Sequence, residues 1–149
     1  MRIAAAVCGV EVQEYKNDRI KESAYMGYRE IETTREIIDG TYKKQSLDPE
    51  IFADEKPFVP NEYITLTDGS ASALCVYRDN CIRLLKDMTA FGIRPQNRLQ
   101  RFALDALLAP AEEIPLVILR GPAGTAKTFL SMAAALDKTY TDEFSRQIG

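Results

Sequence analysis

Two glycines, a lysine and a threonine near the C-terminal end of the sequence have the spacing of a loop that binds nucleotide phosphates. Gly121 is followed by four residues and then by Ala126-Lys127-Thr128, where the pattern is Gly, four residues, then Gly-Lys-Ser/Thr. Gly121 and Gly124 allow a close approach of the backbone to phosphate. Lys127 would bring a positive charge to the β- and γ-phosphates, and Thr128 a hydroxyl to Mg²⁺. The predicted nucleotide site is Gly121, Pro122, Ala123, Gly124, Thr125, Ala126, Lys127 and Thr128.

The predicted loop departs from the pattern at one position, Ala126, which replaces the second glycine. Alanine fits there if it already belongs to the first helical turn, and it is strained if the position needs a positive φ. The alternative is a chance glycine-rich turn in front of a core helix. The flanking sequence favours the phosphate loop, because a compact apolar run precedes it and a helical pattern follows.

Apolar spacing predicts the elements around this loop. Ile114 to Leu119 is typical of a buried parallel strand, and Lys127 to Tyr140 of a helix that is apolar nearly all round. Gln96 to Ala109 has the period of an amphipathic helix. Earlier in the chain we expect a strand near Tyr25–Thr33, a helix at Thr34–Lys44, a loop at Ser46–Pro60, and strands at Tyr63–Leu66, Ala73–Tyr77 and Cys81–Leu85.

These elements predict an α/β fold in three parts. Residues 91–149 would be the N-terminal part of a P-loop NTPase domain with a parallel sheet at its core. Residues 21–90 would form a small β-rich module in front of it. Residues 1–20 are too few to bury a core of their own, and they would be the end of another domain.

Composition limits the chemistry that this chain can perform. The 149 residues carry a formal net charge of −3 and no histidine, so the commonest general base and metal ligand is absent from the sequence. The balance of charge is not that of a strongly basic nucleic-acid-binding domain. No apolar run is long enough to span a membrane. Cys75 and Cys81 would face each other across a hairpin, but we expect a cytoplasmic protein with reduced thiols.

The sequence from Gly92 to Thr128 resembles the start of the PhoH-like ATPase domain. The similarity lies in Gly-Ile-Arg-Pro-Gln-Asn-Arg-Leu-Gln100, Ile-Pro-Leu-Val-Ile-Leu119 and Gly-Pro-Ala-Gly-Thr-Ala-Lys-Thr128. It is strongest to members in which a PIN nuclease domain is fused ahead of the ATPase domain. Val10 to Ile20 resembles the segment that ends that PIN domain, and Asn61-Glu-Tyr-Ile64 resembles the linker module.

The resemblance implies a cytoplasmic enzyme that uses ATP and Mg²⁺ and acts on RNA by unwinding or cleavage. It also implies that the Gln100 amide binds adenine, whereas the alternative is a solvated amide at the start of a helix. The acidic PIN nuclease residues have no counterpart here, and the tail after Tyr140 does not resemble the strand that follows in the family. The chain therefore looks like a fragment of such a protein.

Two functions follow from these observations. The first is an ATP-binding fragment of a PIN–PhoH-type ATPase; the second is a non-catalytic module that binds RNA or a partner protein and carries a vestigial loop. Asp142-Glu143 is rejected as the Mg²⁺-holding pair, because no buried strand precedes it. Without an identified catalytic acid, we expect this chain to bind ATP without turning it over. An unpaired edge on the Ile114–Leu119 strand would favour a homo-oligomer.

Overall fold

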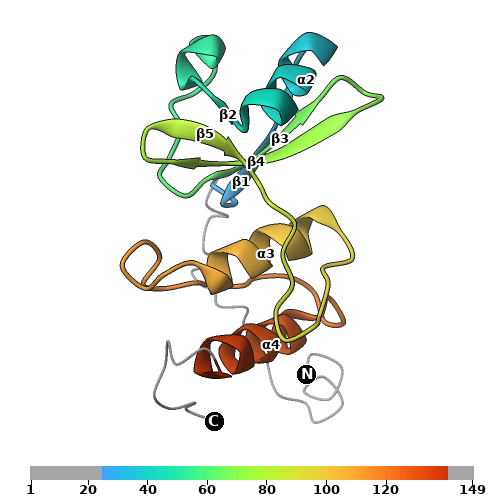
Figure 1. Ribbon diagram of the computed structural model, residues 1–149, viewed down its shortest axis with the longest axis vertical. Helices are drawn as coiled ribbons and strands as arrows, with labels where there is room; N and C mark the ends of the chain where they lie inside the picture. Colours follow the sequence, from blue (N-terminus) through green and yellow to red (C-terminus); the bar gives the residue numbers. More distant parts are fainter. Residues whose placement is uncertain (1–24, 141–149) are drawn as a thin grey trace, which may run out of the picture.

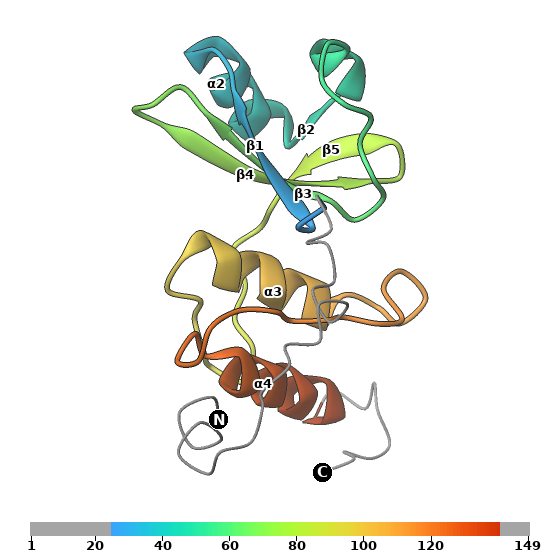
Figure 2. The same ribbon diagram turned by 180° about the vertical axis from the view of Figure 1, so that it is seen from behind.

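The computed structural model describes residues 25–140, which form one sheet with helices on both of its faces. The expected PIN-like segment 1–20 and the Asp142-Glu143 pair lie outside the described residues. The elements are β1 (Tyr28–Glu32), α2 (Arg35–Lys44), β2 (Ser46–Leu47), the 3₁₀ helix η1 (Pro49–Phe52), β3 (Tyr63–Thr67), β4 (Ser72–Arg78), β5 (Cys81–Leu84), α3 (Arg98–Leu108) and α4 (Lys127–Tyr140). Helix α2 covers one face, α3 covers the other, and α4 lies beyond α3 (Figures 1 and 2).

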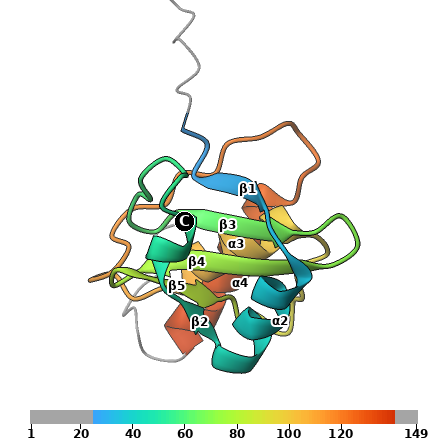
Figure 3. The same cartoon turned by 90° about the horizontal axis from the view of Figure 1, so that it is seen from above.

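The sheet is mixed, with strand order β1-β3-β4-β5-β2 (Figure 3). Strands β1 and β3 are parallel, and the other neighbours are antiparallel. Strands β4 and β5 form a hairpin whose turn residues, Asp79 and Asn80, both have positive φ of 51° and 59°. Such a turn has the twist that two antiparallel strands require, and short polar residues tolerate it best.

Alternating residues of β3 supply two separate cores. Ile64 and Leu66 are fully buried on the α2 side, where they meet Ile38. Tyr63 faces the other way and packs with Phe102 of α3, with ring centroids 4.8 Å apart and planes at 19°. The period of two along the strand therefore assigns each apolar side chain to one helix layer.

Helices α3 and α4 share a third core. Leu104 of α3 is fully buried against Leu130, Ala133 and Ala134 of α4, and Ala90 closes one end of this cluster. The small alanines allow the two helices to lie close together. Outside this core several apolar side chains of α4 stay exposed, namely Phe129, Met132, Leu136 and Tyr140.

A polar contact fixes α3 to the sheet. Asp105 of α3 accepts hydrogen bonds from the Tyr63 hydroxyl at 2.8 Å and from Arg78 Nη2 at 2.6 Å. Arg78 Nε also donates to Asn61 Oδ1 at 2.9 Å. Burial and the Asp105 charge raise the pKa of Tyr63 well above its usual value, so the hydroxyl stays protonated and remains a donor.

The α/β class is confirmed, and the predicted helices and most predicted strands are present with shifted ends. Within the Ser46–Pro60 segment, expected to be a loop, the structure has β2 and η1. The expected parallel core is absent from the described residues, because all five strands lie before residue 85. Ile114–Leu119 is not a strand there: Leu116 is 74% and Ile118 80% exposed. A strand requires a hydrogen-bonded neighbour, and no other described segment pairs with this one.

The two hairpin cysteines do not face each other, contrary to expectation. In the β4–β5 register Cys75 pairs with Leu84, and Cys81 pairs with Arg78. Both thiols are free, and burial raises the pKa of Cys75 to about 12. Cys75 and Cys81 are six residues apart, and a two-residue turn at Asp79 and Asn80 lies between them, so the register cannot place one cysteine opposite the other. No helix among residues 25–140 has the length and apolarity that crossing a membrane requires.

We expect Asp105→Ala to lower the free energy of unfolding by about 2–4 kcal/mol, because Arg78 and the Tyr63 hydroxyl would lose a largely buried acceptor. The matched control is Asp87→Ala. Asp87 also pairs with an arginine, Arg101, but it is 92% exposed, so its loss should cost less than about 0.5 kcal/mol. Urea unfolding of the two variants provides the comparison, and equal losses would contradict a special role for Asp105.

Candidate nucleotide site

The predicted phosphate loop lies between an extended segment and the first turn of α4. Residues 121–124 are exposed, and α4 begins at Lys127. The Leu130 N–H donates to the Ala126 carbonyl at 2.9 Å, which closes the first helical turn. The backbone N–H groups at the start of α4 have no partner within the helix, so this end carries partial positive charge next to the loop.

The Lys127 side chain folds back over the loop. Its Nζ donates to the Gly121 carbonyl at 2.9 Å, to the Pro122 carbonyl at 2.5 Å and to Thr125 Oγ1 at 3.1 Å. Thr125 Oγ1 in turn donates to the Pro122 carbonyl at 2.9 Å. The ammonium group, which was expected to bind phosphate, is thus hydrogen-bonded to oxygens of the loop itself. We call this arrangement the closed loop.

Two loop residues have left-handed backbone conformations. Gly124 has a φ of 79°, which glycine adopts without strain. Ala126 has a φ of 60°. Its Cβ, which a glycine would lack, makes this left-handed backbone conformation less stable by roughly 1–2 kcal/mol. The sequence left this position open between a helical and a strained alanine, and the structure has the strained one.

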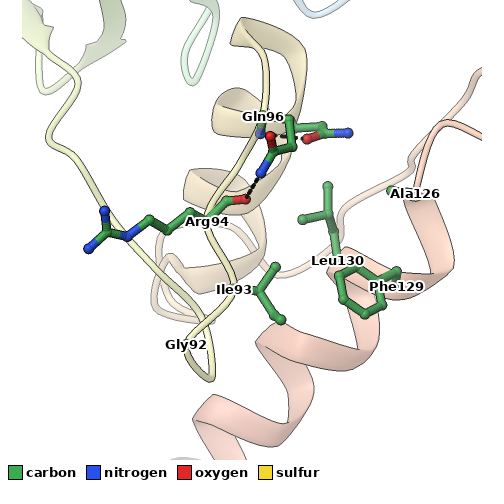
Figure 4. Close-up of a pocket in the computed structure, with 8 residues that line it drawn as sticks. Gly92, Ile93, Arg94, Gln96, Ala126, Phe129 and Leu130 are labelled. Carbon is green, nitrogen blue, oxygen red and sulfur yellow. Dashed lines mark hydrogen bonds between the residues drawn. The ribbon is translucent and has the colours of Figure 1, made fainter.

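A cavity of about 290 Å³ opens beside the end of this loop (Figure 4). It lies between the segment that leads into α3 and the first turn of α4. Its lining residues are Gly92, Ile93, Arg94, Gln96, Gln100, Ala126, Phe129 and Leu130. Gln100, singled out by resemblance, therefore borders the same cavity as loop residue Ala126.

Three hydrogen bonds between residues close in sequence hold the α3 side of the cavity in place. The Gln96 N–H donates to Gln100 Oε1 at 2.7 Å, and Gln96 Nε2 donates to the Arg94 carbonyl at 3.4 Å (Figure 4). Asn97 caps α3 by accepting from the Gln100 N–H at 3.0 Å. The side-chain carbonyl of Gln100 is therefore oriented by the backbone, which leaves its amide N–H groups to point elsewhere.

A tight turn ties this wall to α4. Phe91 and Gly92 both have positive φ, and Ala90 and Ile93 exchange two backbone hydrogen bonds across them. The Phe91 N–H donates to Asp137 Oδ1 at 2.8 Å. The turn that carries Gly92 and Ile93 is thereby joined to the helix that carries the far wall of the cavity.

The structure brings together some predicted residues and adds others that sequence reasoning missed. Thr128, the expected Mg²⁺ ligand, lies exposed in the first turn of α4. The described residues contain no group of three or more His, Cys, Asp or Glu side chains arranged to hold a metal. Ile93 and Phe129 were not predicted. Phe129 lies in a run of apolar helix residues, where periodicity alone does not separate a core residue from a cavity wall.

Three known proteins that are similar to this chain have the same name. A Bacillus subtilis protein, "Protein PhoH2", is 34% identical over 93% of the chain. A Thermobispora bispora protein of the same name is 30% identical over 99% of the chain, and a Mycolicibacterium smegmatis one is 29% identical over 99%. This chain is similar to PhoH2 proteins.

The similarity to PhoH2 proteins covers nearly the whole chain but spans about a third of each relative's length, 33% in all three. No family model matches the chain. No solved structure matches it significantly.

We expect Ala126→Gly to raise the free energy of unfolding by about 0.5–1 kcal/mol, because relief of the left-handed strain exceeds the added freedom of the unfolded chain. Nucleotide affinity should rise or stay unchanged. Ala135→Gly is the matched control, since Ala135 is inside α4 and glycine there should cost about 1 kcal/mol. Thermal and urea unfolding measure both; a loss of stability or of binding in Ala126→Gly would show that its methyl group makes a favourable contact.

Proposed function

We propose that the chain is the part of a PhoH-family protein that binds ATP, with the phosphates on residues 121–128 and adenine beside Gln100. The proposal includes the family activity implied by the resemblance, which couples ATP hydrolysis to RNA unwinding or cleavage in a larger assembly. The observation that carries it is the shared cavity: Gln100 and Ala126 come from separate elements and border the same space. A nucleotide needs one site for its phosphates and an adjacent one for its base.

The phosphate end is supported by charge and geometry. The start of α4 offers backbone N–H groups and the positive end of a helix dipole, which favour an anion. Lys127 adds a full positive charge within the loop. Its present acceptors are neutral oxygens, and a phosphate oxygen would make a stronger, charge-assisted hydrogen bond. Phosphate binding would then draw the ammonium group away from the Gly121 and Pro122 carbonyls.

The base end is supported by the fixed amide of Gln100. Its Oε1 accepts from the Gln96 N–H, which sets the plane of the amide. An amide side chain pairs with the edge of adenine that presents a donor and an acceptor together, and Oε1 retains a second lone pair for the amino group. Thr128, at the first turn of α4, would contribute a hydroxyl to a Mg²⁺ that bridges the phosphates.

A second function is favoured by the closed loop. In the closed loop Lys127 donates hydrogen bonds to the Gly121 and Pro122 carbonyls, and Ala126 has a strained backbone. A vestigial loop that no longer binds phosphate would have the same features. The β-rich module that the sequence predicts for residues 21–90 would then bind RNA or a partner protein without ATP. Titration of a fluorescent ATP analogue with and without Mg²⁺ separates the two functions, because only the first requires saturable, Mg²⁺-dependent binding.

Lys127→Ala should strongly weaken ATP binding, since the phosphates would lose the one cationic side chain of the loop. A charge-assisted hydrogen bond contributes about 1.5–3 kcal/mol, so affinity should fall at least tenfold. Lys43→Ala is the control: Lys43 is an exposed lysine of α2, on the other side of the sheet. Equal affinity of the two folded variants, measured by the same titration, would rule out the loop as the site.

Gln100→Ala should reduce the preference for ATP over GTP, because guanine presents the opposite donor and acceptor pattern at this edge. Affinity for ATP should fall by about fivefold to tenfold, which corresponds to about one hydrogen bond. GTP should be little affected. Competition titrations with both nucleotides give the ratio, and an unchanged ratio would remove Gln100 from base recognition.

A further inference from the structure

We propose that Phe129 is the stacking platform for the nucleobase, and therefore that the cavity beside the loop takes a flat aromatic base. This inference rests on the proposed ATP-binding function and adds a residue to it. Neither the phosphate-loop pattern nor the resemblance assigns a role to Phe129.

The position of Phe129 follows from helix geometry. Ala126 ends the loop, and residues three and four positions later lie on the same side of a helix. Those residues are Phe129 and Leu130, and both line the cavity (Figure 4). Leu130 is 3% exposed and belongs to the α3–α4 core, whereas Phe129 is 55% exposed. Phe129 is therefore the aromatic wall of the cavity that still has a face open to a ligand.

The other walls have the chemistry that a purine requires. Ile93 is an apolar wall on the opposite side, from the turn fixed to α4 through Asp137. Gln100 provides a polar group at the edge of the same space. Proteins commonly recognise a base with apolar surfaces against the faces of its ring and polar groups, such as an oriented amide, at its edge. The volume of about 290 Å³ suits one base with part of its sugar more closely than a whole nucleotide.

Other exposed apolar residues of α4 do not share this placement. Met132 is 60% and Tyr140 83% exposed, and neither lines the cavity. The helical spacing places them on the same exposed stripe as Phe129, so exposure and apolar character alone do not distinguish Phe129 from them. Phe129 differs because its exposed ring borders the end of the phosphate loop, within one helical turn of Ala126. This contrast makes Met132 the matched control.

Inorganic tripolyphosphate and ATP separate base binding from phosphate binding. Phe129→Ala should weaken ATP about tenfold, as loss of one base–aromatic stack does, and should leave tripolyphosphate affinity within about twofold. Met132→Ala should change neither. Phe129→Tyr, which keeps an aromatic face, should retain ATP affinity. Melting curves of each variant confirm equal folded content before titration.

A direct optical signal comes from Phe129→Trp. The chain contains no tryptophan, so this variant has a single indole at the proposed platform. ATP should quench its fluorescence on binding, whereas tripolyphosphate should bind and leave the fluorescence nearly unchanged. The signal reports contact with the base, which a purely structural role of Phe129 would not give.

The outcomes separate the two proposals. If the unaltered chain binds neither ATP nor tripolyphosphate, the ATP-binding function fails and the platform fails with it. If both bind but Phe129→Ala keeps full ATP affinity, the platform alone is wrong. A parallel loss of ATP and tripolyphosphate in Phe129→Ala would also overturn it, because the ring would then act by supporting the loop.

Discussion

The hydrogen bonds from Tyr63 and Arg78 to Asp105 determine how the two halves of this structure meet. They join the sheet to α3 beside the apolar cluster in which the rings of Tyr63 and Phe102 stack, and they add a directional contact to that packing. A carboxylate that accepts from two different strands cannot shift without losing a partner. Because α4 packs on α3, and Asn97 and Gln100 lie at the start of α3, the geometry of the candidate site depends on this junction.

The same junction reaches the segment that leads to the loop. Arg78 also binds Asn61, whose Nδ2 donates to the Glu113 carbonyl at 3.4 Å. A second ion pair, between Arg29 and the almost fully buried Glu62, holds the neighbouring proline-rich stretch through the Lys56 and Pro57 carbonyls. These arginines are positioned by fork-shaped hydrogen bonding rather than by charge alone, so lysine would be a poor replacement for either.

The sequence predicted the features that depend on local patterns. The periods of 3.6 and 2 located α2, α3, α4 and the β3–β5 strands, and the resemblance singled out Gln100 as a candidate for binding adenine. It did not predict what depends on distant partners. Ile114–Leu119 has strand composition, but a strand forms only if another pairs with it. Residue types also do not specify how α3 and α4 pack together. Three features depend on that packing: the positive φ of Ala126, the direction of the Lys127 side chain and the exposure of the Phe129 ring.

The connector between α3 and α4 gives the molecule an uneven local stability. From Pro115 to Thr125 no backbone N–H donates to the backbone of another described residue, and the stretch is largely open to solvent. The strands β3 and β4 are paired on both sides. Amide hydrogens of the connector should therefore exchange with solvent rapidly, through local opening. Those of the central strands should exchange slowly, because their exchange requires global unfolding. An anion bound to the loop would make these local openings less frequent as its occupancy rises. Amide exchange in the connector would therefore slow at ligand concentrations too low to change exchange in the central strands.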